Sequence, residues 1–134
     1  MKVLVTGGAG FIGSHLCEKL IKDGYFVYCL DNLLTGREAN IAKLKQKKNF
    51  QFIKADVSQA EIDLEIDQIV HLASPASPVD YQKLPLETML ANSQGTENML
   101  RLAQKTKAKF LLASTSEVYG DPLEHPQSED YYGN

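Results

Sequence analysis

Short apolar runs alternate with helical patterns along this chain, and their order predicts the class of fold. A run of roughly four to eight apolar residues is typical of a buried strand, whereas apolar residues three and four positions apart are typical of a helix with one buried face. The runs predict five strands, at Lys2–Val5, Tyr25–Leu30, Phe50–Lys54, Gln68–Leu72 and Phe110–Ala113.

Helical patterns separate most of these strands. A first helix is expected from Phe11 to the Asp23-Gly24 pair, because glycine commonly follows the last helical turn. A short helix is expected over Glu38–Gln46 and a long one over Leu86–Lys105, with Pro85 in its first turn. The apolar stripe of the first helix, expected to face the sheet, contains Ile12, Leu16, Cys17, Leu20 and Ile21.

Proline and polar residues mark the loops. Three prolines fall within Ala73–Pro85, and proline does not fit a helix interior or a central strand, so this segment is predicted to be a loop. Loops are also predicted over Asn32–Arg37 and Gly120–Asn134.

The alternation of strands and helices predicts an α/β fold: one Rossmann-like domain over residues 1–134, with a doubly wound parallel sheet and helices on both faces. In such sheets, ligands bind outside the carboxyl ends of the strands. That rule selects the candidate residues, which are Gly7–Gly13, Asp31, Asp56, Ala73–Ser77 and Ser114–Glu117.

A turn with three regularly spaced glycines joins the first strand to the first helix. Gly7 allows a sharp turn, Gly10 leaves the backbone N–H groups open to a pyrophosphate, and Gly13 lets the helix pack closely. The N-terminus of the helix would then face the anionic groups of a ligand. An ordinary glycine-rich turn is the alternative, but a strand before and a helix after favour dinucleotide binding.

Asp31 lies at the end of the second predicted strand. A carboxylate there can accept hydrogen bonds from ribose hydroxyls and repels a 2′-phosphate, which favours NAD over NADP. Arg37 could meet a 2′-phosphate, but it lies six residues further along the chain. A carboxylate that merely caps a loop remains the alternative.

Two further strand ends could contact the same ligand. Asp56 could accept from the adenine amine while Val57 packs on the ring, or Asp56 could simply form a turn. The small residues of Leu72-Ala73-Ser74 could let a cofactor pass close to the backbone, or could reflect packing alone.

Hydroxyls and a carboxylate follow the last predicted strand, in Ser114-Thr115-Ser116-Glu117. Hydroxyls can form hydrogen bonds with a substrate oxygen that becomes a carbonyl during hydride transfer. A carboxylate can act as an acid or a base if burial raises its pKa. The alternative is a serine/threonine turn with an exposed acid.

Composition excludes several classes of function. A net charge of −3 favours neither nucleic acid nor an anionic membrane, and no apolar run approaches the length of a membrane span. Cys17 and Cys29 form no disulfide framework, so we expect free thiols in a reducing cytoplasm. The spacing of the three histidines predicts no metal site.

Four stretches resemble extended short-chain dehydrogenases, the NAD-dependent epimerase/dehydratase family. They are Thr6–Ser14, Asp31–Arg37, Asn92–Thr96 and Ser114–Gly120. The resemblance implies NAD binding and adds cofactor contacts at Phe11, Ile12, Asn32, Thr35, Gly36, Asn92 and Ser114. Such enzymes act on nucleotide sugars through a 4-keto intermediate.

Two further stretches, Ala73–Tyr81 and Glu117–Gln127, are most similar to UDP-glucuronate decarboxylases. In sugar dehydratases the triplet that corresponds to residues 115–117 resembles Thr-Asp-Glu, and its aspartate is the proton donor. This chain has Ser116 at that position, and serine is a poor proton donor. The resemblance implies conversion of UDP-glucuronate to UDP-xylose. It also implies that Thr115 forms a hydrogen bond with the C4 oxygen of the sugar and that Ser116 and Glu117 contact the substrate. A 4-epimerase, a 4,6-dehydratase and a dinucleotide-binding module without turnover remain alternatives.

The family's Tyr-x-x-x-Lys pair is absent, because no tyrosine here is followed by lysine four residues later. We therefore expect an amino-terminal part of a longer enzyme, truncated before the last strands and the substrate domain. Alone, it is expected to bind NAD at best. The full-length parent is expected to be a homodimer that uses the helix over Leu86–Lys105.

Overall fold

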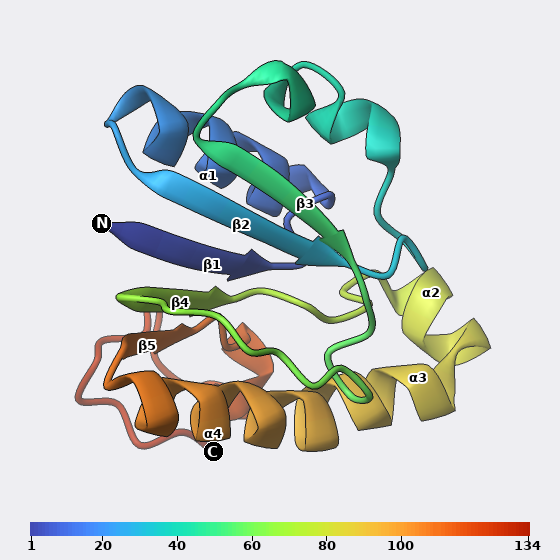
Figure 1. Cartoon of the computed structure of the whole chain (residues 1–134). Coiled ribbons are helices and arrows are strands. Elements are labelled where there is room, and N and C mark those ends of the chain that lie inside the picture. The colour runs from blue at the N-terminus through green and yellow to red at the C-terminus, as the bar shows by residue number, and fades with distance from the viewer.

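The computed structural model describes residues 1–134 and is built around a five-stranded parallel sheet (Figure 1). Its strands are β1 (Lys2–Thr6), β2 (Phe26–Asp31), β3 (Phe50–Lys54), β4 (Gln68–His71) and β5 (Lys109–Leu112). Their order is β3-β2-β1-β4-β5, and every neighbouring pair is parallel. The predicted fold class is confirmed, and each predicted strand is present with its ends displaced by one residue at most.

Four helices and several shorter turns connect the strands. The helices are α1 (Phe11–Lys22), α2 (Pro78–Lys83), α3 (Pro85–Leu90) and α4 (Thr96–Thr106). A π-helical turn over Ala91–Gly95 joins α3 to α4, and 3₁₀ turns lie at Glu38–Ile41, Leu44–Gln46 and Ser116–Tyr119. The short helix expected over Glu38–Gln46 is therefore two 3₁₀ turns, whereas the predicted first helix is confirmed.

The sheet has a hydrophobic core on each face, because successive strand residues point to opposite sides. Val3 and Val5 of β1 pack with Cys17 of α1 in one core. Leu4, between them, packs with Met99 of α4 in the other. The central strands are therefore apolar on both faces, which is why they appear in the sequence as unbroken apolar runs.

The prediction of a loop over all of Ala73–Pro85 was wrong, because residues 78–83 form α2. Pro78 occupies the first turn of this helix, where its missing N–H has no helical acceptor to lose. Ser77 precedes it in an extended conformation. Proline thus begins two consecutive helices here rather than excluding helix from the segment.

The long helix predicted over Leu86–Lys105 is helical throughout but changes its hydrogen bonding in the middle. Within the π-helical turn, Asn92 Nδ2 donates to the Thr88 carbonyl at 2.9 Å and Ser93 Oγ donates to the Met89 carbonyl at 2.7 Å. Such side-chain donors compete with the backbone, and π turns are frequent at functional sites.

Ile12 does not belong to the sheet-facing stripe of α1, since its side chain is 69% exposed. It lies in the first turn of the helix, which projects past the carboxyl ends of the strands. Cys17 and Cys29 are free thiols, as predicted, and both are buried. None of the helices combines the length and the hydropathy that crossing a bilayer would require.

Candidate functional site

A cleft of about 870 Å³ runs along the carboxyl ends of the strands, a size within the usual range of small-molecule sites. It gathers every residue that the sequence proposes for the cofactor: Gly7, Gly10, Phe11, Ile12, Gly13, Asp31, Asn32, Thr35, Gly36, Asp56, Val57, Leu72, Ala73, Ser74, Asn92 and Ser114. Thr115 and Glu117 line it as well. Ser116 is the one proposed site residue that does not.

The glycine turn at the end of β1 is closely packed. Gly7 has φ +67°, and a Cβ there would lie 2.9 Å from the backbone carbonyl of Leu72. A Cβ at Gly13 would lie 2.2 Å from the Gly7 carbonyl oxygen. Helix α1 therefore approaches the backbone of the turn itself, and larger residues at either position would push the turn out of place.

The turn leaves backbone donors at the N-terminus of α1. The N–H groups of Phe11, Ile12 and Gly13 have no acceptor in the protein, and no side chain caps the helix. Free donors at the positive end of a helix dipole bind anions such as phosphate. The exposed side chains of Phe11 and Ile12 add apolar walls beside these donors. These features fit a dinucleotide with a diphosphate at its centre.

Asp31 ends β2 and is almost fully buried. Its Oδ2 accepts from the Ala9 N–H at 2.9 Å, and its Oδ1 accepts from the Leu33 N–H at 2.8 Å. A Cβ on Gly36 would lie 2.8 Å from Oδ1, so glycine is needed where the loop crosses the carboxylate. Asp31 thus holds the glycine turn against the end of β2, and its remaining lone pairs are available to a ligand.

Asp56, after β3, is already engaged on both carboxylate oxygens. Burial raises its pKa, but hydrogen bonds from the Ser58 hydroxyl, the Ser58 N–H and the Asn32 amide outweigh this effect and lower the pKa below its ordinary value. The bond from Asn32 Nδ2 is 2.8 Å long. Asp56 therefore fixes the loops after β2 and β3 as an anion, while the neighbouring Val57 is buried under the cleft.

The loop after β4 is tied to the π-helical turn. Asn92 Nδ2 donates to Ser74 Oγ at 2.9 Å, as well as to the Thr88 carbonyl. The irregular turn thus directs the Asn92 amide toward the strand ends, which places it on the wall of the cleft.

The segment after β5 forms a serine/threonine turn. The Thr115 hydroxyl oxygen accepts from the Glu117 N–H at 3.4 Å, and the hydroxyl donates to the Glu117 carboxylate. Residues 114–117 are all exposed. Glu117 is therefore not buried, and burial is the condition under which its carboxylate was expected to transfer protons. Thr115 and Glu117 both line the cleft.

The sequence did not predict one wall of the cleft. Side chains from α2 and α3 line it: Asp80, Tyr81, Glu87 and Thr88. In the view of Figure 1, α2 and α3 lie on the same side as the carboxyl ends of the strands. The Ser77-Pro78 pair, a common start for a helix, was the signal that could have predicted α2.

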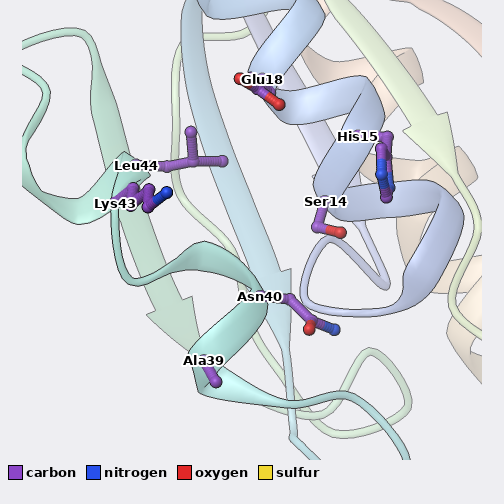
Figure 2. Close-up of a pocket in the computed structure, with 7 residues that line it drawn as sticks. All are labelled: Ser14, His15, Glu18, Ala39, Asn40, Lys43 and Leu44. Carbon is purple, nitrogen blue, oxygen red and sulfur yellow. The ribbon is translucent and has the colours of Figure 1, made fainter.

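A second, smaller cleft of about 300 Å³ lies between α1 and the segment after β2 (Figure 2). Two residues of its lining make hydrogen bonds to the glycine turn and the start of α1. Ser14 Oγ donates to the Phe11 carbonyl at 3.1 Å, and Asn40 Nδ2 donates to the Ala9 carbonyl at 2.8 Å. None of the proposed cofactor or catalytic residues lies in it.

The sequence matches a known family over most of its length. The family model described as GDP-mannose 4,6 dehydratase matches residues 4–132. UDP-glucuronic acid decarboxylase 1 of Arabidopsis thaliana is 55% identical over 134 residues, which are 100% of this chain and 31% of that protein. The chain thus spans about a third of the length of the curated relative it matches.

Solved structures of epimerases share the fold. UDP-N-acetylglucosamine 4-epimerase from Methanobrevibacter ruminantium M1, in complex with UDP-N-acetylmuramic acid, is 32% identical with a TM-score of 0.85, covering 99% of this chain and 44% of that one. UDP-glucose 4-epimerase from Bifidobacterium longum, in complex with NAD⁺ and UDP, is 28% identical with a TM-score of 0.79, covering 97% and 42%.

Proposed function

The chain belongs to the GDP-mannose 4,6 dehydratase family of NAD-dependent epimerases and dehydratases, and we propose that it binds NAD as part of a UDP-glucuronate decarboxylase. The cleft carries this proposal, because it brings the glycine turn, Asp31 and the segment after β5 to one edge of the sheet. The 55% identity to a UDP-glucuronic acid decarboxylase supports the choice of reaction.

Different residues of the cleft contact different parts of the dinucleotide. The free N–H groups of Phe11, Ile12 and Gly13 bind the diphosphate. Asp31 accepts from the adenosine ribose hydroxyls, with Asn32, Thr35 and Gly36 beside it, and Val57 contacts the adenine. Residues 72–74, Asn92 and Ser114 lie toward the opposite end of the cleft. Bound NAD would supply a hydride acceptor and donor for the sugar.

The residues after β5 act on the sugar. Thr115 donates a hydrogen bond to the C4 oxygen, and Ser116 and Glu117 contact the sugar, with Glu117 exchanging its present bond to Thr115 for one to the substrate. A carbonyl at C4 is β to the C6 carboxylate, and a β-keto acid loses CO₂ without a strong proton donor. Serine at position 116 is therefore compatible with decarboxylation, whereas dehydration would require a proton donor there.

A chimera tests the reaction. Residues 1–134 would replace the matching region of the Arabidopsis decarboxylase, to which they are 55% identical. We expect the chimera to release CO₂ and form UDP-xylose, and we expect Thr115→Val to abolish turnover while leaving NAD bound. A chimera that folds and binds NAD but only epimerises UDP-glucose would overturn the decarboxylase assignment.

The isolated 134 residues provide the matched comparison. They contain no Tyr-x-x-x-Lys pair, so we expect them to bind NAD without consuming UDP-glucuronate. Turnover by this chain would contradict that expectation. We further propose that the parent is a homodimer joined through the exposed apolar face of α3, where Leu86 is 66% and Met89 57% exposed. Sedimentation of the chimera would reveal it.

A further inference from the structure

A buried histidine below the cleft has no part in the function proposed above. His71, the last residue of β4, is 2% exposed. Its Nδ1 lies 2.7 Å from Thr6 Oγ1 on β1, and its Nε2 lies 3.2 Å from Thr96 Oγ1 at the start of α4. One imidazole therefore joins the neighbouring strands β1 and β4 to α4.

The direction of these hydrogen bonds follows from Thr6. Its hydroxyl oxygen accepts from the N–H groups of Leu72 at 3.1 Å and Ala73 at 3.2 Å, which occupies both lone pairs. The hydroxyl must then donate to His71 Nδ1. Burial lowers the pKa of His71, so the ring is neutral and carries its proton on Nε2. His71 therefore donates to Thr96 Oγ1.

Thr96 differs from the other hydroxyl residues of this helical segment. Thr88, Ser93 and Thr106 each donate to the carbonyl four residues earlier, at 2.7, 2.7 and 2.9 Å. Thr96 makes no such bond, and its one partner is His71. The π-helical turn ends at the preceding residue, and Thr96 lines the cleft. The Thr96 hydroxyl hydrogen therefore makes no hydrogen bond to a carbonyl of the helix.

We propose that the Thr96 hydroxyl donates a hydrogen bond to an acceptor oxygen of the bound dinucleotide, and that His71 is the residue that positions it. This inference rests on the proposed NAD binding. As the donor, His71 occupies one lone pair of Thr96 Oγ1 and cannot accept the hydroxyl hydrogen, so that hydrogen is available to an acceptor in the cleft. Thr6 completes the arrangement by fixing the tautomer of His71.

Calorimetric titration of the 134-residue chain with NAD tests the role of Thr96. Thr96→Val keeps the shape of the side chain but removes the hydroxyl, and we expect affinity to fall about threefold to tenfold, as for the loss of one neutral hydrogen bond. Thr96→Ser should remain within about twofold of the unaltered chain. Thr106→Val is the matched control, because that hydroxyl bonds the Leu102 carbonyl outside the cleft.

A double-mutant cycle separates positioning from a purely structural role. We expect His71→Phe to weaken NAD binding when Thr96 is present and to add nothing in the Thr96→Val background. Equal losses in both backgrounds would overturn the positioning role. Absence of NAD binding by the unaltered chain would instead refute the proposed function, whereas binding that Thr96→Val does not affect would refute only this inference.

The tautomer can be measured without any substitution. Nitrogen chemical shifts of the His71 ring in the unaltered chain should show a neutral imidazole with its proton on Nε2. A proton on Nδ1 would contradict the assigned direction of the bonds, whatever the behaviour of the variants.

Discussion

Gly8→Ala is expected to destabilise the chain through steric contacts under the glycine turn. A Cβ at Gly8 would lie 2.5 Å from Cys29 Sγ, the most severe contact, 3.2 Å from the Val5 carbonyl oxygen and 3.3 Å from Cys17 Sγ. Atoms in favourable van der Waals contact are about 3.5–4.0 Å apart, so either the turn or the thiol must move by about 1 Å. Both cysteines are fully buried and have little room to yield.

The expected magnitude follows from two opposing effects. Overpacking a buried site costs about 1–3 kcal/mol, whereas replacing glycine by alanine stabilises by about 0.4–1 kcal/mol through the unfolded state. We therefore expect Gly8→Ala to lower the free energy of unfolding by about 1–2 kcal/mol. Cys29→Ala should cost about 1–2 kcal/mol by itself, since it removes one buried heavy atom and leaves a small cavity.

Urea unfolding followed by circular dichroism would measure both substitutions and their combination. Because Cys29→Ala removes the atom that Gly8→Ala collides with, the double variant should be less destabilised than the sum of the single variants by about 1 kcal/mol or more. Gly24→Ala is the control: Gly24 has φ +87° and no atom within 4 Å of its Cβ position, so its cost should be purely additive with Cys29→Ala. Additivity of Gly8→Ala with Cys29→Ala would refute the steric explanation.

Two further predictions concern buried polar groups. Burial lowers the pKa of His71 below its ordinary 6.5, so below that pH the unfolded chain binds a proton more readily than the folded chain, and the free energy of unfolding should fall as the pH drops below 6.5. Urea unfolding at pH 7.5 and 5.5 should show a smaller fall in this free energy for His71→Phe than for the unaltered chain, and an equal fall would contradict this reasoning. Asp31→Ala should lower the free energy of unfolding by about 1–3 kcal/mol, because it leaves the Ala9 and Leu33 N–H groups without an acceptor; Asp63→Ala, which breaks an exposed ion pair with Lys105, is the control and should change it by less than about 1 kcal/mol.

The strands could be predicted from the sequence because their apolar runs reflect burial on both faces of the sheet. Val3, Leu4 and Val5 are all fully buried, with Leu4 in one core and its neighbours in the other. Successive residues of a strand point to opposite faces, so a strand that lies between two cores buries every residue. Parallel strands joined by crossovers place all of their carboxyl ends at one edge of the sheet, and this is the edge at which the cleft lies.

The wall formed by α2 was not predicted because Pro78 was interpreted as a residue that breaks helices, whereas only Pro85 was placed in the first turn of a helix. Its effect depends on position: Pro78 and Pro85 both lie in first turns, where they favour helix. The bonds between Thr6, His71 and Thr96 were beyond prediction for another reason. They join residues 65 and 25 positions apart in the chain, and no local pattern records such a contact.

Ile12 lines the cleft, where its predicted cofactor contact would place it, but it does not pack against the sheet as its helical spacing predicts. Its spacing from Leu16 matches a buried helical stripe, and that pattern alone predicts contact with the sheet. Its position next to Gly13 argues otherwise, because a helix that begins at a glycine turn extends its first residues past the strand ends. An apolar residue there has no core to enter, and Ile12 is 69% exposed on the wall of the cleft. In a parallel α/β sheet, apolar residues in the first turn after such a glycine turn are therefore better interpreted as walls of the ligand site than as core.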